Sequence, residues 1–160
     1  MRPVGLRDGD GWVACDCGRP HWGLYGAAGL LLVRRDLGEP HVLLQLRAAW
    51  THGGGTWALP GGALDSHEDP VEAAAREAFE EAGIDAANFE VKAVFSDDHG
   101  NWRYDTVIAH SYGDAGAHDA NMESDAVRWV PLPQVREFPL HPGLAASWGA
   151  LQGHVLDTLA

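Results

Sequence analysis

Residues 61–84 read GGALDSHEDPVEAAAREAFEEAGI, and this stretch decides the fold of the 160-residue chain. Residues 69–82 within it predict a long helix, because residues that favour helix ends stand on either side. These are Glu68 or Asp69 as the N-terminal cap, Pro70 at the first helical position, and Gly83 after the last turn. Just before the helix, the pair Gly61 and Gly62 ends a short strand and favours a tight turn.

The predicted helix carries three carboxylates on one side. With about 100° between successive residues, Glu77, Glu80 and Glu81 share a stripe roughly 100° wide. A separate apolar face, suited to packing on a sheet, is formed by Val71, Ala75, Ala78 and Ala82. Like charges so close together weaken a helix, whereas a divalent cation would neutralise them, and oxygen ligands suit Mg²⁺ or Mn²⁺. The stripe therefore predicts a metal site, with a solvent-exposed acidic helix as the alternative.

Short apolar runs bounded by turn residues flank this helix, and each predicts a strand. They cover residues 27–33, 42–46, 56–59, 89–95, 106–111 and 127–130. The first two runs are expected to pair, and residues 96–103 are expected to form a loop. Residues 143–159 are rich in Ala and Leu and predict a second helix. Strands on both sides of a long helix, with another helix at the end, indicate a mixed sheet with helices on its faces.

The length and composition indicate one globular domain. Hydrophobic residues at 46% and charged residues at 21% exclude wholesale disorder. The polar, glycine-rich residues 1–22 are expected to form an irregular N-terminal arm, and residues 23–160 a single domain. The longest uncharged apolar stretch, residues 23–33, is much shorter than the about 20 residues of a membrane span. We therefore expect a soluble, cytoplasmic protein.

The net charge argues against nucleic acid or membrane partners. Eleven Lys and Arg against 23 Asp and Glu give a formal net charge of −12. Such a surface repels nucleic acid and anionic lipid at long range. If the substrate is a phosphate compound, a divalent metal is the usual means of neutralising it.

The two cysteines, Cys15 and Cys17, are separated by a single residue. Together with His21 they could be three zinc ligands, but a structural zinc site uses four ligands and cysteines usually spaced by two to four residues. The spacing and a reducing cytoplasm also disfavour a disulfide between them. We therefore expect two reduced thiols in a loop.

The spacing of residues 62–84, written as Gly, five residues, Glu, seven residues and REAFEEAGI, resembles the Nudix box at every defining position. Residues 57–60 (WALP) and 128–131 (RWVP) are similar to the strands that enter the box and close the sheet in that family. The GAAGLLL and FPLHPG segments are similar to MutT-like members of the actinobacterial type. The resemblance implies an α/β protein with the Nudix fold, an α/β/α sandwich with a mixed β-sheet. It also implies Mg²⁺-dependent hydrolysis of a nucleoside diphosphate linked to another moiety, with Mn²⁺ as a substitute.

The resemblance also assigns roles to single residues. The metal ligands that it implies are Glu77, Glu80, Glu81 and the backbone carbonyl of Gly61 or Gly62. A glycine turn lets a carbonyl approach an ion because no Cβ blocks it. Glu68 and Arg76 are expected to form an ion pair that braces the loop against the helix, with Gly62 in a supporting position.

The general base is left open among several carboxylates. Glu123 is the preferred candidate because it precedes the closing strand. The other candidates are Glu77, Glu80, Asp97, Asp98 and Asp125. Ala126 stands where related sequences often carry a second Glu, so one expected carboxylate is absent there.

Substrate contacts are expected from aromatic side chains and from the segment before the last helix. The candidates are Trp57, His141 and Trp148, with Trp50, Trp102, Tyr104 and Trp129 as further aromatic residues. The leading substrate is an oxidised purine triphosphate such as 8-oxo-dGTP, cleaved to a monophosphate and pyrophosphate. ADP-ribose, a dinucleotide or a nucleotide sugar is the alternative within the enzyme class. A nucleotide-sensing module without turnover is the alternative outside it, and a homodimer is possible because dimers are common in the family.

Overall fold

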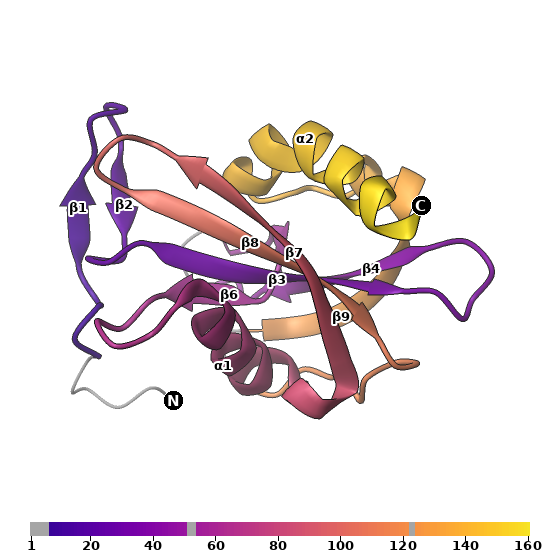
Figure 1. Cartoon of the computed structure of the whole chain (residues 1–160). Helices are drawn as coiled ribbons and strands as arrows, with labels where there is room; N and C mark the ends of the chain where they lie inside the picture. The colour runs from indigo at the N-terminus through magenta and orange to yellow at the C-terminus, as the bar shows by residue number, and fades with distance from the viewer. Residues whose placement is uncertain (1–6, 51–53, 122–123) are drawn as a thin grey trace.

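A mixed seven-stranded sheet forms the centre of the molecule, with one helix on each face (Figure 1). The computed structural model describes residues 7–50, 54–121 and 124–160. Five strands lie in the order β5-β4-β3-β8-β7, while β6 pairs with β3 and β9 pairs with β4. The sheet strands are β3 (Ala27–Arg34), β4 (His41–Arg47), β5 (Trp57–Ala58), β6 (Gly61–Ala63), β7 (Phe89–Asp98), β8 (Arg103–Ser111) and β9 (Ser124–Pro131). The helices are α1 (Pro70–Ala82) and α2 (Pro142–Leu159), with the 3₁₀ turns η1 (Ala86–Asn88) and η2 (Leu132–Glu137).

Side chains of β3, β4 and β8 alternate between two apolar cores, because successive residues of a strand point to opposite faces. The core against α1 is built from Ala28, Leu30, Leu32, Leu43, Val107 and Ala109 with Ala73, Ala74, Ala78 and Ala82 of the helix. The core against α2 is built from Leu31, Val33, Val42, Leu44 and Ile108 with Leu144, Trp148, Leu151 and Val155. Both faces of the central strands are covered, which explains why the sequence there is continuously apolar. The α/β/α sandwich expected from the sequence is confirmed.

The ends of α1 follow from its capping residues. Of the two candidates for the N-cap, Asp69 occupies the position, and its carboxylate accepts a bond of 2.8 Å from the backbone N–H of Glu72. The Glu72 carboxylate in turn accepts a bond of 3.0 Å from the backbone N–H of Asp69, which completes a capping box. Gly83 ends the helix in the left-handed conformation, at φ 68°. These caps fix where the acidic stripe of the helix begins and ends.

Strand β6 was not predicted from the sequence, which placed a turn at Gly61 and Gly62. These residues pair with Gly29 and Ala28 at the start of β3. A Cβ at Gly61 would lie 2.5 Å from the carbonyl oxygen of Ala28, so only glycine lets the two backbones approach so closely. Two of the three residues of β6 are glycines, so the strand shows no alternation of apolar and polar side chains. The sequence pattern therefore does not reveal it.

Two other expectations need correction. Residues 12–22 are not irregular, because β1 (Trp12–Ala14) and β2 (Pro20–Trp22) form an antiparallel hairpin. The paired Trp12 and Trp22 rings meet edge to face at 5.3 Å, a cross-strand contact that stabilises such a short hairpin. The loop expected over residues 96–103 is also shorter, because β7 and β8 stay paired as far as Asp98 and Arg103. The division of the chain into an arm and one domain stays a prediction.

No helix in the described ranges of the chain combines the length and the apolar character needed to span a membrane.

Candidate active site

The acidic stripe of α1 lies against β6 and the end of β4. Glu77 and Glu81 stand one helical turn apart, and each is only 3% exposed. The Glu81 carboxylate accepts bonds from the backbone N–H of Gly61, at 3.0 Å, and from the side-chain amide of Gln45, at 3.1 Å. Glu80 is more open, with about a third of its side chain exposed. Two of the three predicted metal ligands are therefore buried carboxylates held by the sheet.

Two details of this region fit a hard divalent cation. The side-chain oxygen of Gln45 is buried and has no hydrogen-bond partner among the described residues, although its amide nitrogen bonds Glu81. A Cβ at Gly62 would lie 2.7 Å from the Glu77 carboxyl group, so glycine keeps the space beside that carboxylate open. Carboxylate, amide and backbone carbonyl oxygens are the ligands that Mg²⁺ and Mn²⁺ prefer. The residues present thus fit the metal implied by the sequence.

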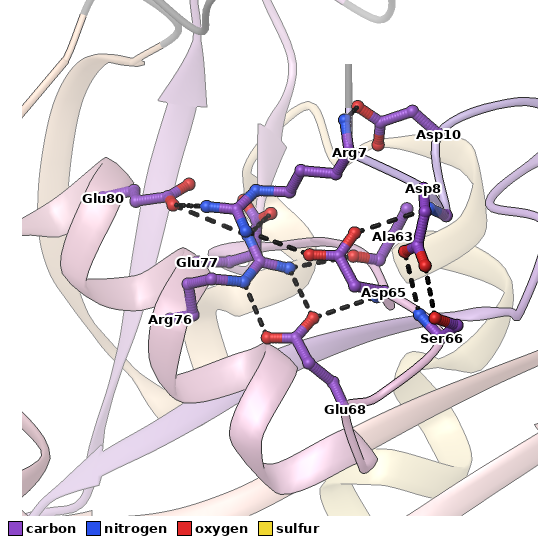
Figure 2. A network of polar contacts seen from close by, with 11 residues as sticks. Arg7, Asp8, Asp10, Ala63, Asp65, Ser66, Glu68, Arg76, Glu77 and Glu80 are labelled. Carbon is purple, nitrogen blue, oxygen red and sulfur yellow. Dashed lines mark hydrogen bonds and ion pairs between the residues drawn. The ribbon is translucent and has the colours of Figure 1, made fainter. Parts of the chain in front are cut away.

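Arg76 joins the loop before α1 to the acidic stripe (Figure 2). Its guanidinium group donates two bonds to Glu68, at 2.8 and 2.9 Å, one to the backbone oxygen of Ala63 and one to Glu77, at 2.7 Å. Burial lowers the pKa of Arg76, but the bonds to Glu68 and the charge of Glu77 outweigh it and raise the pKa above its ordinary value. The ion pair predicted between Glu68 and Arg76 is present in the structure. Its contribution to activity stays a prediction.

Arg7 is a second guanidinium group at the site, and the sequence analysis missed it. It donates one bond of 2.9 Å to Asp65 and one of 2.8 Å to Glu80 (Figure 2). Its bond to Asp65, opposed by burial, raises the pKa of Arg7 above its ordinary value. Arg7 and Glu80 are 73 residues apart in the chain, so no local sequence pattern announces the contact.

Tyr104 is a half-buried residue whose phenol group lies close to the same carboxylates. Burial, and then the nearby charge of Glu81, raise the pKa of Tyr104 well above its ordinary value, so its hydroxyl stays protonated. That hydroxyl lies 3.1 Å from where a Cβ at Gly61 would stand. The sequence suggests Tyr104 only as a stacking aromatic, whereas the structure places its hydroxyl beside β6.

The base candidates other than the box glutamates lie elsewhere or are not described. Glu123, the preferred one, falls outside the described residues, and so does the side chain of Asp125. Asp97 is 3.1 Å from the His99 ring, and Asp98 accepts a bond from the backbone N–H of Gly100. Asp97 and Asp98 thus stabilise the turn between β7 and β8. The assignment of the general base stays a prediction.

The three predicted substrate contacts separate into two groups. Trp57 and His141 are brought together, because the backbone N–H of His141 donates to the Trp57 carbonyl at 2.8 Å. Trp57 also packs edge to face on Phe138. Trp148 is different, since it is 1% exposed and extends from α2 into the core between that helix and the sheet. The sequence-based proposal of Trp148 as a substrate contact is therefore corrected, because a side chain covered on all sides cannot stack on a ligand.

Comparison with known proteins agrees with this fold and site. The model of a family described as "NUDIX domain" matches residues 24–151. A Mycobacterium tuberculosis protein named "Putative 8-oxo-dGTP diphosphatase 3" is 52% identical over 152 residues, which cover 91% of this chain and 70% of that protein. A Bifidobacterium longum protein named "Nucleoside triphosphate pyrophosphatase/Nudix hydrolase fusion protein" is 44% identical over 95% of this chain and 32% of its own length.

Solved structures give the same result. The crystal structure of a Nudix hydrolase from M. smegmatis, RenU, superposes with a TM-score of 0.86 at 46% identity, over 93% of this chain and 96% of that one. A C. elegans Ap4A hydrolase shares the fold at 19% identity, with a TM-score of 0.67 over 82% of this chain and 98% of that one. Fold and site together define a hydrolase that acts on phosphoanhydrides. The chain belongs to the Nudix family.

Proposed function

We propose that the chain is a Mg²⁺-dependent nucleoside triphosphate pyrophosphohydrolase whose preferred substrate is 8-oxo-dGTP or a related oxidised purine nucleotide. The observation that carries this proposal is the 52% identity to the M. tuberculosis protein, together with an acidic stripe in which all the box glutamates are present. A complete set of glutamates also favours an enzyme over a nucleotide-sensing module. The products are a nucleoside monophosphate and pyrophosphate, and we place the activity in the cytoplasm.

In this proposal Glu77, Glu80 and Glu81 hold the metal, with the carbonyl of Gly61 as a further ligand. When bound, the ion supplies positive charge to the phosphoryl oxygens and lowers the pKa of water. The protein orients these ligands through other residues. Gln45 and the backbone of Gly61 fix the Glu81 carboxylate, and Arg76 fixes that of Glu77. Because Glu77 and Glu81 are buried, their orientation is set before substrate arrives.

The other groups act on the nucleotide and the attacking water. Glu123 remains the proposed general base, with Glu77 and Glu80 as alternatives. Trp57 in β5 and His141 at the N-cap of α2 are proposed to contact the base or sugar, because a backbone bond holds the two residues next to each other. Tyr104 offers a protonated hydroxyl beside β6 that can donate to a phosphate oxygen.

A substrate panel at fixed Mg²⁺ tests the proposal. The compounds are 8-oxo-dGTP, dGTP, ADP-ribose, a diadenosine polyphosphate and NADH, and the quantity compared is kcat/KM. We expect 8-oxo-dGTP to exceed dGTP by at least tenfold. A preference for ADP-ribose or a dinucleotide would overturn the proposed substrate while leaving the phosphoanhydride chemistry in place. Absence of turnover on every compound would favour the nucleotide-sensing module.

A further inference from the structure

Four metal-binding side chains converge at the tip of the N-terminal hairpin. The thiols of Cys15 and Cys17 and the imidazoles of His21 and His99 each offer one ligand atom, and these four atoms all lie within 4.8 Å of one another. The first three residues come from the β1–β2 hairpin and its turn, and His99 comes from the turn between β7 and β8. The fourth ligand that the local sequence lacks is therefore supplied by a distant segment.

The spacing of these atoms suits a tetrahedral zinc ion. Bonds of about 2.3 Å to sulfur and about 2.0 Å to nitrogen place the ligand atoms of such a site about 3.3–3.8 Å apart. The Cys17 sulfur and the His21 Nε2 atom are already 3.1 Å apart. No two of the four atoms are more than 4.8 Å apart, so the remaining atoms need to approach one another by at most about 1.5 Å to reach zinc-site distances.

The backbone around the two cysteines is arranged as a metal-binding turn. The backbone N–H of Gly18 donates to the Cys15 carbonyl at 3.0 Å, and Gly18 has a φ of 92°, which favours glycine. The backbone N–H of Cys17 points at the Cys15 sulfur, at 3.5 Å. The turn compensates for the single residue between the cysteines, because it folds both thiols toward the same side.

The two imidazoles are held by groups outside the cluster. The His99 Nε2 atom is 3.1 Å from the Asp97 carboxylate, which leaves Nδ1 for an ion. A carboxylate behind a ligating histidine is a common feature of zinc sites, because it fixes the tautomer and the ring orientation. The His21 ring stacks on Trp102, with centroids 4.1 Å apart and planes 12° from parallel. Trp102 is fixed in turn by its indole N–H, which donates to the Gly23 carbonyl.

The two segments are also joined by bonds that need no metal. The side chain of Asn101 accepts from the backbone N–H of Asp16, at 2.8 Å, and donates to the carbonyl of Ala14, at 2.9 Å. His99 is only two residues from Asn101, so this pair of bonds fixes its position relative to the cysteines. The cluster is therefore preorganised by the fold.

We propose that Cys15, Cys17, His21 and His99 bind one structural Zn²⁺ ion that fastens the β1–β2 hairpin to the turn between β7 and β8. The thiolate and imidazole ligands separate this site chemically from the carboxylates of α1, which favour Mg²⁺. Metal binding here stabilises the attachment of the N-terminal hairpin to the sheet. It takes no part in hydrolysis and does not depend on the identity of the substrate.

The test is metal analysis of the full chain, expressed with zinc and passed over a chelating resin. We expect one zinc ion per chain in the wild type and less than about a tenth of that in Cys17→Ser and His99→Gln, because loss of one ligand opens the site. His41→Gln is the matched histidine control, and Glu81→Gln the control for the acidic stripe. Both should keep the zinc, which excludes the catalytic metal as its source.

Two measurements on the wild type keep the result independent of whether the variants fold. Co²⁺ added to the apo protein should give the intense near-ultraviolet absorption of thiolate ligation, which carboxylates cannot produce. A thiol reagent should modify both cysteines faster after zinc is removed. Absence of zinc and of this cobalt absorption would overturn the proposal. So would a Cys15–Cys17 disulfide in freshly purified protein, or full zinc content in Cys17→Ser and His99→Gln.

Discussion

Glu77 and Glu81 are buried one turn apart, and this is an arrangement that folding alone does not favour. Two carboxylates with 3% exposure each lose most of their hydration, and like charges at this spacing repel one another. Arg76 compensates Glu77, while Gln45 and the Gly61 backbone bond Glu81. The free-energy cost of burying two like charges is explained if the two carboxylates bind a cation that enters between the helix and β6.

The substitution Glu81→Gln separates the cost of burying this charge from its proposed use in metal binding. We expect kcat/KM to fall about 100-fold or more, because one charge of the metal site is lost. Stability should stay equal or rise, since the amide keeps an oxygen for the Gly61 N–H and removes a buried charge. The measurements are kcat/KM on the best substrate of the panel and the thermal midpoint. The exposed Glu39→Gln is the control, and wild-type turnover in Glu81→Gln would show that the assignment of Glu81 is wrong.

The Glu68 carboxyl group predicts how the free energy of unfolding depends on pH. Burial raises its pKa, but the bonds from Arg76 outweigh burial and hold the pKa of Glu68 below its usual value near 4.5. A carboxyl group with a lowered pKa stabilises the fold above its unfolded pKa, and this contribution is lost as the pH falls through the folded pKa. Glu68→Gln should therefore cost about 2 kcal/mol at pH 7, because Arg76 loses a charged partner while it keeps Glu77 and the Ala63 carbonyl.

Denaturant unfolding of wild type and Glu68→Gln between pH 7 and pH 3 measures this effect. The difference in the free energy of unfolding should be constant from pH 7 to about pH 5 and should shrink below that. Glu72→Gln is a suitable comparison, since Glu72 is exposed and its carboxylate accepts a bond from the backbone N–H of Asp69 at the start of α1. A difference between Glu68→Gln and wild type that grows on acidification would contradict the proposed ion pair.

At the scale of elements, the fit between β6 and α1 decides the shape of the site. Gly62 pairs with Ala28 on one side and faces the Glu77 carboxyl group on the other. No side chain fits in that space, so β6 depends on glycine for a steric reason. Gly153 of α2 has no such role, since a Cβ at that position would meet no atom within 4 Å.

The pair Gly62→Ala and Gly153→Ala tests this distinction. In Gly62→Ala the added methyl group displaces the Glu77 carboxylate, so the Mg²⁺ concentration for half-maximal activity should rise at least tenfold. In Gly153→Ala the same methyl group should leave activity unchanged and stabilise the helix by about 0.5–1 kcal/mol. Metal titration and chemical unfolding measure the two effects. Equal activities of both variants would show that the space beside Gly62 is not needed.

At the scale of the whole molecule, the described part of the N-terminal segment contacts both the acidic stripe and the turn between β7 and β8. Arg7 reaches Asp65 and Glu80 at the acidic stripe, and the cysteine turn meets the β7–β8 turn through Asn101. A chain with a net charge of −12 places one of its few cations directly on a predicted metal ligand. If Glu80 is a metal ligand, as proposed, Arg7 and the cation compete for its carboxylate.

Arg7→Ala should lower the Mg²⁺ concentration for half-maximal activity by several-fold at low ionic strength, because the positive charge that competes for Glu80 is removed. The same substitution should make the segment over residues 7–22 more sensitive to limited proteolysis. Arg19→Ala, in the exposed turn of the hairpin, is the control for a general change in charge. A higher Mg²⁺ requirement in Arg7→Ala would mean that Arg7 supports metal or substrate binding instead.

The sequence by itself determined the helix, its C-terminal cap, the main strands and the position of the acidic stripe. All of these are local, because a turn of helix, a cap or an apolar strand is encoded within a few neighbouring residues. Gly83 and the spacing of Glu77, Glu80 and Glu81 are read directly from residues 61–84, whereas the N-cap is narrowed only to Glu68 or Asp69. The α/β/α sandwich followed from these elements and from the resemblance to the Nudix family.

Only the tertiary structure decided which distant residues meet. Strand β6 exists because glycines let it lie against β3, and Trp148 is in the core because α2 presents it to the sheet. Gln45 meets Glu81 across 36 residues, and Arg7 meets Glu80 across 73. His99 joins the cysteine turn in the same way, which changes an incomplete set of three ligands into four. Such contacts depend on the packing of the whole sheet, so no local pattern of residues can encode them.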